Sequence, residues 1–283
     1  MANPESELKK VMFVPLGVSY LLALQSPYLI DIENNPEVMT TLVHKLGLSK
    51  DLSWHDVFSL DDPELLAFVP RPAHALLLVF PVSKAYERFR AEEDKDLPAY
   101  TGFGPNEEVL WFKQTIGNAC GLMGLLHAVS NGMTRDLIGS STTKSPGQIR
   151  SLTRAIVPAT PLSNLITEAI PRPPAERVKL IETSSDLATA HASAAATGST
   201  EAPPAEASID LHFVAFVKSS ENNLWELDGS RKGPLNRGKL PEGEDVLGET
   251  AIDLGPRKFL KREAESADGE LRFSILALGP GFG

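Results

Sequence analysis

Cysteine is nearly absent from this sequence. Among 283 residues there is one, Cys120, so the chain cannot form an internal disulfide. Disulfides belong to oxidising compartments, whereas single thiols persist where the surroundings are reducing. The sequence therefore predicts a cytoplasmic protein in which any thiol chemistry depends on Cys120.

Runs of positive charge and long apolar runs are also lacking. The chain has 27 Lys and Arg against 37 Asp and Glu, a formal net charge of −10, which disfavours nucleic acid as a partner. The most apolar stretch, residues 11–32, is interrupted by Pro15, Gly17 and Pro27 and falls short of the roughly 20 apolar residues of a membrane helix. Residues 1–10 mix Glu with Lys, unlike the start of a secretory signal. We expect neither a membrane nor a secreted protein.

The overall composition is that of a globular protein. Hydrophobic residues make up 42% of the chain and charged residues 23%, which is ordinary for a folded domain. The length suits one domain spanning residues 1–283, with ample chain to bury a core.

Local patterns predict several helices and strands. Asn35 and Pro36 begin a helix that ends before Gly47, because Asn is a good N-cap and Pro suits the first turn. Short apolar runs indicate strands, and apolar residues at helical spacing indicate helices. The remaining predicted strands are 54–58, 76–80, 211–217, 224–229 and 271–278, and the remaining predicted helices are 84–93, 120–131 and 175–196.

The residues around Cys120 favour a reactive thiol. An apolar helical pattern begins directly after it, and the dipole and unpaired N–H groups of a helix N-terminus favour the thiolate. Gln114 supplies an amide donor of the kind that stabilises an oxyanion, and Asn118 would turn the chain and lend another donor. Gly121 and Gly124, which have no side chain, would allow other parts of the backbone to approach the helix closely around the thiol. The alternative is a buried structural cysteine.

A thiol nucleophile also needs a base and a residue that orients the base. Strands 211–217 and 224–229 predict an antiparallel hairpin. If the hairpin turns symmetrically around Ser220, His212 lies opposite Asp228 with the two Cβ atoms about 5 Å apart. The alternative for Asp228 is a solvated residue in a turn, and the opposing histidine favours the catalytic role.

Other histidines fit this role less well. His127 is two helical turns from Cys120, about 10 Å along the axis, and is expected to be a packed or capping residue. His55 and His74 flank predicted strands without a suitable acid nearby. His191, on the helix of 175–196, is expected to be solvated.

The motif at residues 114–121 resembles the active-site motif of the ubiquitin carboxy-terminal hydrolases, a papain-like cysteine peptidase family. His212-Phe213 and the segment 226–229 (Glu-Leu-Asp-Gly) are similar to the family's catalytic His and Asp segments. The resemblance extends from Asn35 through the strand of residues 76–80 to residues 271–273. It implies an α-β-α sandwich with a central, mainly antiparallel six-stranded sheet and a knotted backbone.

The resemblance also implies a function. Cys120, His212 and Asp228 would be the catalytic triad, and Gln114 the oxyanion donor, of a monomeric enzyme that cleaves ubiquitin from small or unstructured adducts without a metal or organic cofactor. Ubiquitin contacts would fall on Pro15, Leu16 and the segment Glu270, Leu271, Arg272 and Phe273. Two alternatives are a protein that sequesters free ubiquitin and the same chemistry on a ubiquitin-like modifier.

Two departures from the family pattern stand out. The interval from His212 to Asp228 is one residue longer than expected, which places an insertion in the polar turn. Residues 17–32 are either an atypical apolar insertion or the product of a gene-model error such as a retained intron, so the contacts expected at Pro15 and Leu16 lie beside an altered segment. Residues 197–208 are small, polar and proline-rich and are expected to form the mobile part of a loop over the active site.

Overall fold

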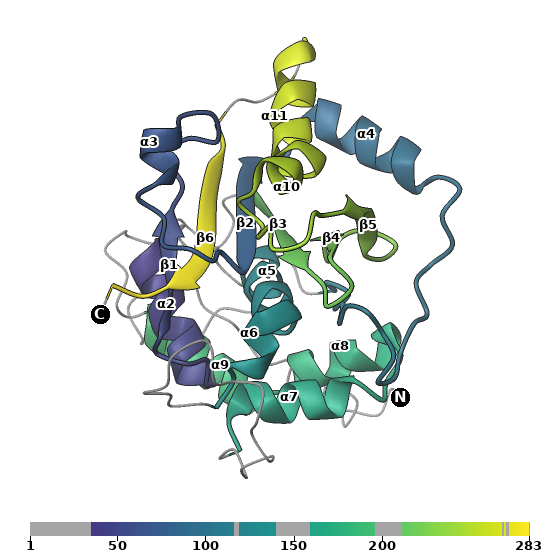
Figure 1. Ribbon diagram of the computed structural model, residues 1–283. Coiled ribbons are helices and arrows are strands. Elements are labelled where there is room, and N and C mark those ends of the chain that lie inside the picture. Colours follow the sequence, from purple (N-terminus) through teal and green to yellow (C-terminus); the bar gives the residue numbers. More distant parts are fainter. Residues whose placement is uncertain are drawn as a thin grey trace.

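The computed structural model describes residues 35–115, 119–139, 159–195, 211–267, 269 and 272–282 (Figure 1). The predictions made for residues 17–32 and 197–208 lie outside these ranges. The same holds for five expected site residues, namely Pro15, Leu16, Asn118, Glu270 and Leu271.

A six-stranded sheet forms the centre of the molecule, in the order β1-β6-β2-β3-β4-β5 (Figure 1). All five neighbouring pairs are antiparallel. The central strand β2 is buried along its whole length, as its continuous apolar run predicts. The strands are β1 (Leu52–Asp56), β2 (Ala75–Pro81), β3 (Leu211–Lys218), β4 (Asn223–Leu227), β5 (Leu235–Lys239) and β6 (Ser274–Pro280).

Helices cover both faces of this sheet. On one face, Leu77 and Phe213 pack in a core with α2, α5, α7, α8 and α9; on the other, Leu76 and Phe216 pack in a core with α4, α10 and α11. The expected α-β-α sandwich is therefore confirmed, while the knot stays a prediction. The helices are α2 (Pro36–Leu46), α3 (Pro63–Leu66), α4 (Lys84–Asp94), α5 (Cys120–Val129), α6 (Gly132–Asp136), α7 (Pro161–Ala169), α8 (Pro174–Glu182), α9 (Ser185–Ala195), α10 (Glu249–Leu254) and α11 (Pro256–Glu265).

Helix α2 begins as predicted and covers the outer edge of β1. The Asn35 side chain accepts hydrogen bonds from the first turn, which is the N-cap contact that its sequence indicates. Farther along α2, the Thr40 hydroxyl accepts the Trp54 N–H at 2.8 Å, and His44 Nε2 donates to the Leu52 carbonyl at 2.7 Å. Side chains of α2 thus satisfy two backbone groups on the exposed edge of the strand.

Several predicted elements differ from the structure in their bounds. Residues 175–196 were expected to form one helix, but α8 ends at Glu182 and α9 starts at Ser185, because Thr183 N–H bonds Lys179 and Ser184 N–H bonds Ile181 in a closing turn. The first strand runs over 52–56 rather than 54–58, and the last begins at Ser274 rather than at residue 271. Short elements with weak patterns, such as β5 and α10, have no counterpart among the predicted segments.

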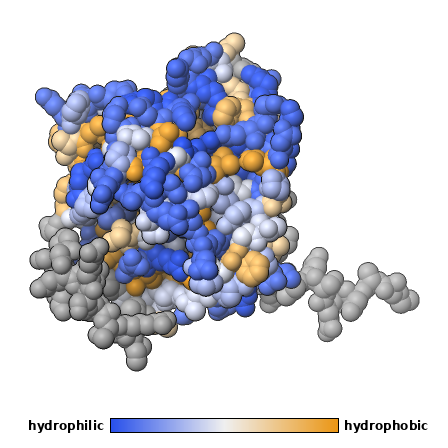
Figure 2. All heavy atoms as spheres, turned by 45° about the vertical axis from the view of Figure 1, so that its right-hand side comes forward, coloured by the Kyte–Doolittle hydropathy of each residue, from blue (hydrophilic) through white to orange (hydrophobic). Residues whose placement is uncertain are grey.

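Figure 2 shows a mainly hydrophilic face in which hydrophobic residues form small separate patches. The most exposed large apolar side chains include Phe58, Phe68 and Phe282. Within the described ranges, every helix is too short or too polar to cross a bilayer.

Candidate active site

Helix α5 carries Cys120 at its first position, as the sequence predicts. The helix packs closely on the sheet because Gly124 has no side chain: a Cβ there would lie 2.8 Å from Leu77 Cδ2 and 3.3 Å from Phe213 Cβ. Cys120 is buried, and its Sγ lies 3.6 Å from the Leu211 carbonyl oxygen. The thiol is therefore held at the start of β3, beside His212.

His212 and Asp228 are in contact, although by a different register from the one predicted. Phe216 pairs with Glu226 rather than with Leu224, so the turn is displaced by one residue and the pairing by two. The turn is displaced because Asn222 adopts a left-handed conformation, with φ at 62°, and closes it with a hydrogen bond to Ser219. A shift of two residues leaves side chains on the same face. His212 and Asp228 consequently meet diagonally, with Nε2 2.8 Å from Oδ1, and Asp228 lies just after β4 rather than within a strand.

The buried carboxylate gives His212 a strong affinity for its proton. Burial lowers the pKa of His212, but the negative charge of Asp228, its hydrogen bond and the Cys120 side chain outweigh burial and raise the pKa to about 10. The pKa of Asp228 is held far below its usual range: burial opposes this shift, and His212, Tyr86 and Ser230 outweigh it. Because Nε2 bonds Asp228, Nδ1 is the nitrogen left for Cys120. His212 thus joins the thiol to the carboxylate.

Gln114 lies on an extended segment, residues 109–114, that is bonded to the turn after Asp228. The Gln114 N–H donates to the Gly229 carbonyl at 2.9 Å, and Trp111 Nε1 donates to the Asp228 carbonyl at 3.1 Å. Lys113 Nζ donates to the backbone carbonyls of the two residues that follow Gly229. Hydrogen bonds therefore join the segment that carries the expected oxyanion donor to the turn that carries the expected carboxylate.

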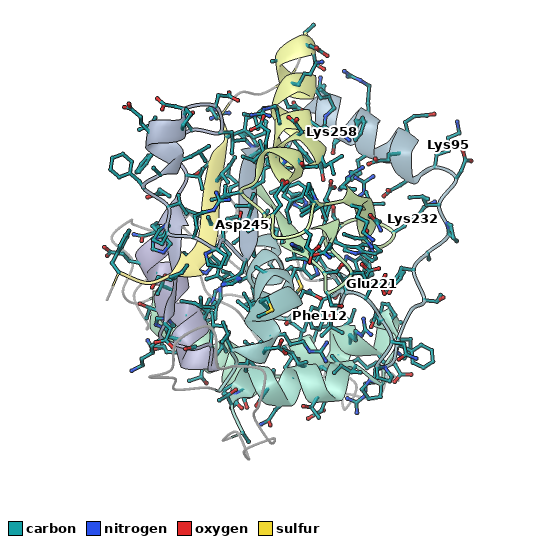
Figure 3. All side chains as sticks on the ribbon, in the orientation of Figure 1. Lys95, Phe112, Glu221, Lys232, Asp245 and Lys258 are labelled. Carbon is teal, nitrogen blue, oxygen red and sulfur yellow. The ribbon has the colours of Figure 1, made fainter. Side chains whose placement is uncertain are left out.

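His127 of α5 and Asn131, the N-cap residue of α6, hold the other side of this segment. Asn131 bonds both backbone groups of Leu110, at 2.6 and 2.9 Å. His127 Nε2 accepts the Phe112 N–H at 3.0 Å, and the two rings stack with centroids 6.0 Å apart. Figure 3 shows Phe112 beside α5. His127 is a packed residue, as expected from its distance to Cys120.

The turn after Asp228 is also tied to α4 by buried ion pairs. Arg231, 1% exposed, contacts Glu93 at 2.5 Å, Asp94 at 2.7 Å and Glu226 at 3.3 Å. Arg237 on β5 contacts the same Glu93 and Glu226. At the rim of this region, Lys232 Nζ donates to the Lys95 carbonyl, and Figure 3 shows both residues on the same side of the molecule.

Two residues that contact the catalytic side chains, Tyr86 and Ser230, were missed by the sequence analysis. Tyr86 on α4 donates its hydroxyl proton to Asp228 Oδ2 at 2.6 Å, and Ser230 donates to Oδ1. Tyr86 lies 142 positions from Asp228, so no spacing rule connects them. Ser230 directly follows the Asp-Gly pair, and serine in such turns often bonds a nearby acceptor, which is the one signal that could have identified it.

The remaining predictions have mixed outcomes. His191 is 2% exposed rather than solvated, because α9 packs its face against α2, and burial lowers the pKa of His191 to about 3. Arg272 and Phe273 lie just before β6, and the centroid of the Phe273 ring lies 5.9 Å from that of Phe80.

Within the described residues, no cluster of His, Cys, Asp and Glu is arranged to hold a metal ion.

Comparison with known proteins gives consistent matches. The family described as ubiquitin carboxyl-terminal hydrolase, family 1, matches residues 29–254. Ubiquitin carboxyl-terminal hydrolase YUH1 of Saccharomyces cerevisiae is 32% identical over 259 residues, covering 89% of this chain and 95% of the relative. The human isozyme L1 is 32% identical over 247 residues, covering 87% and 96%.

A solved structure has the same fold. The catalytic domain of Trichinella spiralis UCH37, bound to ubiquitin vinyl methyl ester, superposes with a TM-score of 0.61 at 19% identity, covering 91% of this chain and 97% of that one. The family match over residues 29–254 and the near full-length relatives show that this chain belongs to the ubiquitin carboxyl-terminal hydrolases of family 1.

Proposed function

We propose that this protein hydrolyses the bond that follows the last glycine of ubiquitin, with Cys120 as the nucleophile. The observation that carries the proposal is the contact of His212 with both Asp228 and Cys120. A general base between a thiol and a carboxylate is the arrangement that covalent acyl transfer requires. Relatives named as ubiquitin hydrolases support ubiquitin as the substrate.

The proposed reaction has two halves. In the first, Cys120 Sγ attacks the glycine carbonyl carbon while His212 holds the thiol proton, and His212 then gives that proton to the departing amine. In the second, water attacks the resulting thioester, His212 takes the water proton, and the carbon–sulfur bond breaks to restore Cys120. The Gln114 amide and the Cys120 N–H would hold the oxyanion in both halves.

Reaction with ubiquitin that bears an electrophilic carboxy terminus tests this proposal. The wild-type protein should form a covalent adduct at Cys120, located by mass spectrometry, and Cys120→Ala should bind ubiquitin with nearly unchanged Kd without forming it. Tight binding by the wild type with no adduct would favour a protein that sequesters ubiquitin. A preference for an electrophilic ubiquitin-like modifier would change the substrate and keep the chemistry.

We further propose that the adducts are small or unstructured and that the enzyme is a monomer of the cytoplasm. The composition of residues 197–208, together with their place just before the His212 strand, supports a size limit on the leaving group. Ubiquitin fused to a short peptide should be cleaved much faster than folded di-ubiquitin. Inserting about ten Gly and Ser residues near Gly198 should narrow that difference at little cost in stability, since loop closure depends weakly on length. Equal rates on both substrates before the insertion would refute the size limit.

A further inference from the structure

The Asp228 carboxylate is fully buried and has more partners than a catalytic triad supplies. Its Oδ1 accepts from His212 Nε2 at 2.8 Å, from the Ser230 N–H at 2.8 Å and from the Ser230 hydroxyl at 2.7 Å. Its Oδ2 accepts from the Tyr86 hydroxyl at 2.6 Å. Donors from three different segments therefore fix the plane of this carboxylate.

The Tyr86 hydroxyl is a rigid donor. The Tyr86 backbone N–H bonds the Ser83 hydroxyl at 2.8 Å, and Ser83 in turn donates to Glu263 of α11 at 2.5 Å. The Tyr86 ring lies edge-on to Phe80 with centroids 4.7 Å apart. Burial and then the charge of Asp228 raise the pKa of Tyr86 well above its usual value. The hydroxyl consequently keeps its proton and donates to Oδ2 at every working pH.

The Ser230 hydroxyl is oriented by a cation. Arg90 Nη1 donates to Ser230 Oγ at 2.7 Å. Arginine has donors and no acceptor, so the Ser230 oxygen must accept this bond and turn its own proton elsewhere. The nearest acceptor is Asp228 Oδ1, whereas His212 Nε2 is 3.5 Å away. The Arg90 guanidinium also lies 5.5 Å from the centre of the Tyr86 ring. Helix α4 therefore supplies the Tyr86 hydroxyl and, through Arg90, orients the Ser230 hydroxyl.

We propose that Tyr86 and Ser230 are positioning residues that hold the Asp228 carboxylate so that Oδ1 faces His212. The two hydroxyls act on opposite oxygens, so together they oppose rotation of the carboxylate about its bond to Cβ. With either donor removed, Oδ1 turns away from His212, and the imidazole loses part of the interaction that keeps its proton. The inference rests on the proposed function for its effect on turnover.

Other charged or titratable groups also surround this pair, and all of them are kept in the variants below, although Ser230→Ala removes the acceptor of the Arg90 bond. They come from four elements and the extended segment: Cys120 of α5, Arg90 of α4, Lys113 of residues 109–114, Glu226 of β4 and Arg262 of α11, whose guanidinium lies 5.6 Å from the Tyr86 ring centre.

Tyr86→Phe and Ser230→Ala test the proposal, and the chain offers a matched control for each. Tyr100 donates its hydroxyl to Glu107 at 2.9 Å, and Ser219 donates to Glu108 at 2.5 Å, so Tyr100→Phe and Ser219→Ala remove the same kinds of bond away from His212. The substrate is ubiquitin with a fluorogenic carboxy-terminal amide. Each test variant should lower kcat on the order of tenfold, the effect of one hydrogen bond to a charged group, and change KM less than about twofold.

A pH titration separates positioning from a general loss of structure. When kcat/KM is plotted against pH, its fall on the alkaline side should begin at lower pH in the test variants, because His212 gives up its proton more readily. The two controls should keep the wild-type profile, and Ser230→Thr, which retains a hydroxyl, should restore it. Wild-type kcat and an unmoved alkaline fall in both test variants would overturn the inference, as would an equal shift in the controls.

A measurement without turnover distinguishes failure of this inference from failure of the proposed function. The imidazole resonances of His212 can be followed by NMR as the pH rises. Loss of the His212 proton should occur at lower pH in Tyr86→Phe and Ser230→Ala than in the wild type or the controls. If wild-type protein shows no Cys120-dependent cleavage of ubiquitin but this shift is present, the function is wrong and the positioning is right. If the shift is absent, the positioning is wrong.

Discussion

The imidazole of His127 accepts a hydrogen bond from the backbone N–H of Phe112, two residues before Gln114. To accept this bond Nε2 must carry no proton; a protonated Nε2 would instead donate to the Phe112 carbonyl oxygen, 3.2 Å away, and lose the bond to the N–H. Burial lowers the pKa of His127 from 6.5 to about 4, against smaller opposing effects of the backbone at Phe112 and of Asp228. The hydrogen bond between Phe112 and His127, close to the expected oxyanion donor, thus depends on pH.

Acid should therefore destabilise the fold before the carboxylates titrate. Above pH 6.5 His127 is neutral in both the folded and the unfolded protein, so it does not affect the free energy of unfolding. As the pH falls from 6.5 to about 4, the unfolded chain binds a proton more readily than the folded one, and stability is lost. The loss should be on the order of 1–3 kcal/mol for such a group, with His191 adding to it. Urea unfolding at pH 7, 5.5 and 4.5 measures it. His127→Gln does not titrate at this position, so its stability should vary less over this interval, and a slope equal to that of the wild type would contradict the assignment.

Alkaline conditions should act through His212. Its pKa is raised to about 10, with burial opposed by Asp228 and Cys120. The sign is opposite to that of His127: this contribution to stability is complete below pH 6.5 and is lost as the pH rises toward 10. Asp228→Asn removes the charge that raises the pKa, so unfolding measured between pH 7 and pH 10 should show a weaker loss than in the wild type. A parallel loss in both proteins would assign the effect to other groups.

His212 and Asp228 should act as one unit in catalysis. Asp228→Asn should slow kcat more than it weakens ubiquitin binding, because an amide can hold the imidazole in the wrong tautomer. The double variant His212→Ala with Asp228→Asn should lose little beyond His212→Ala alone. Losses in kcat that simply multiply would show that the two residues work independently.

Gln114 should contribute to the chemical step. Gln114→Ala is expected to reduce kcat on the order of 10²–10³, the usual cost of one oxyanion donor. KM for the fluorogenic ubiquitin amide should change little, since the interaction forms in the transition state. A kcat loss below about threefold would remove Gln114 from this role.

Gly229 offers an independent test of the framework around Gln114. A Cβ at Gly229 would lie 2.9 Å from Gln114 Cβ and 3.2 Å from its backbone nitrogen. Gly229→Ala should push Gln114 out of place and reduce kcat by up to about 10²-fold, a typical effect of small misplacement. Gly281→Ala, which meets Ser53 Oγ at 3.0 Å on the edge strand β1, is the control. Equal kcat in both variants would mean that the segment adapts to the extra methyl group.

Sequence patterns predicted the elements whose apolar residues recur regularly, such as α2, β2, α5 and β3. They also paired His212 with Asp228, because an even error in register leaves two side chains on the same face. The register itself was wrong because Asn222 and Asn223 are both residues that tolerate a positive φ, and the sequence does not indicate that Asn222 is the one that adopts it.

The supports of the site were beyond sequence reasoning. Tyr86 is one aromatic residue on a charged helix, and Arg231 is one of several basic residues in a turn. Their roles arise from contacts across 142 and 137 positions, which no local period encodes. A single sequence reports which residues form helices and strands, but it does not report which distant side chains meet once the layers pack.

The contacts of Thr40 and His44 with β1 also affect solubility. An open strand edge is a template on which a second chain can add its own strand. Here the hydroxyl accepts from the Trp54 N–H and the imidazole donates to the Leu52 carbonyl, so neither group is available to pair with a second chain. Weakening the two contacts would leave both backbone groups open to pairing with a strand of another chain.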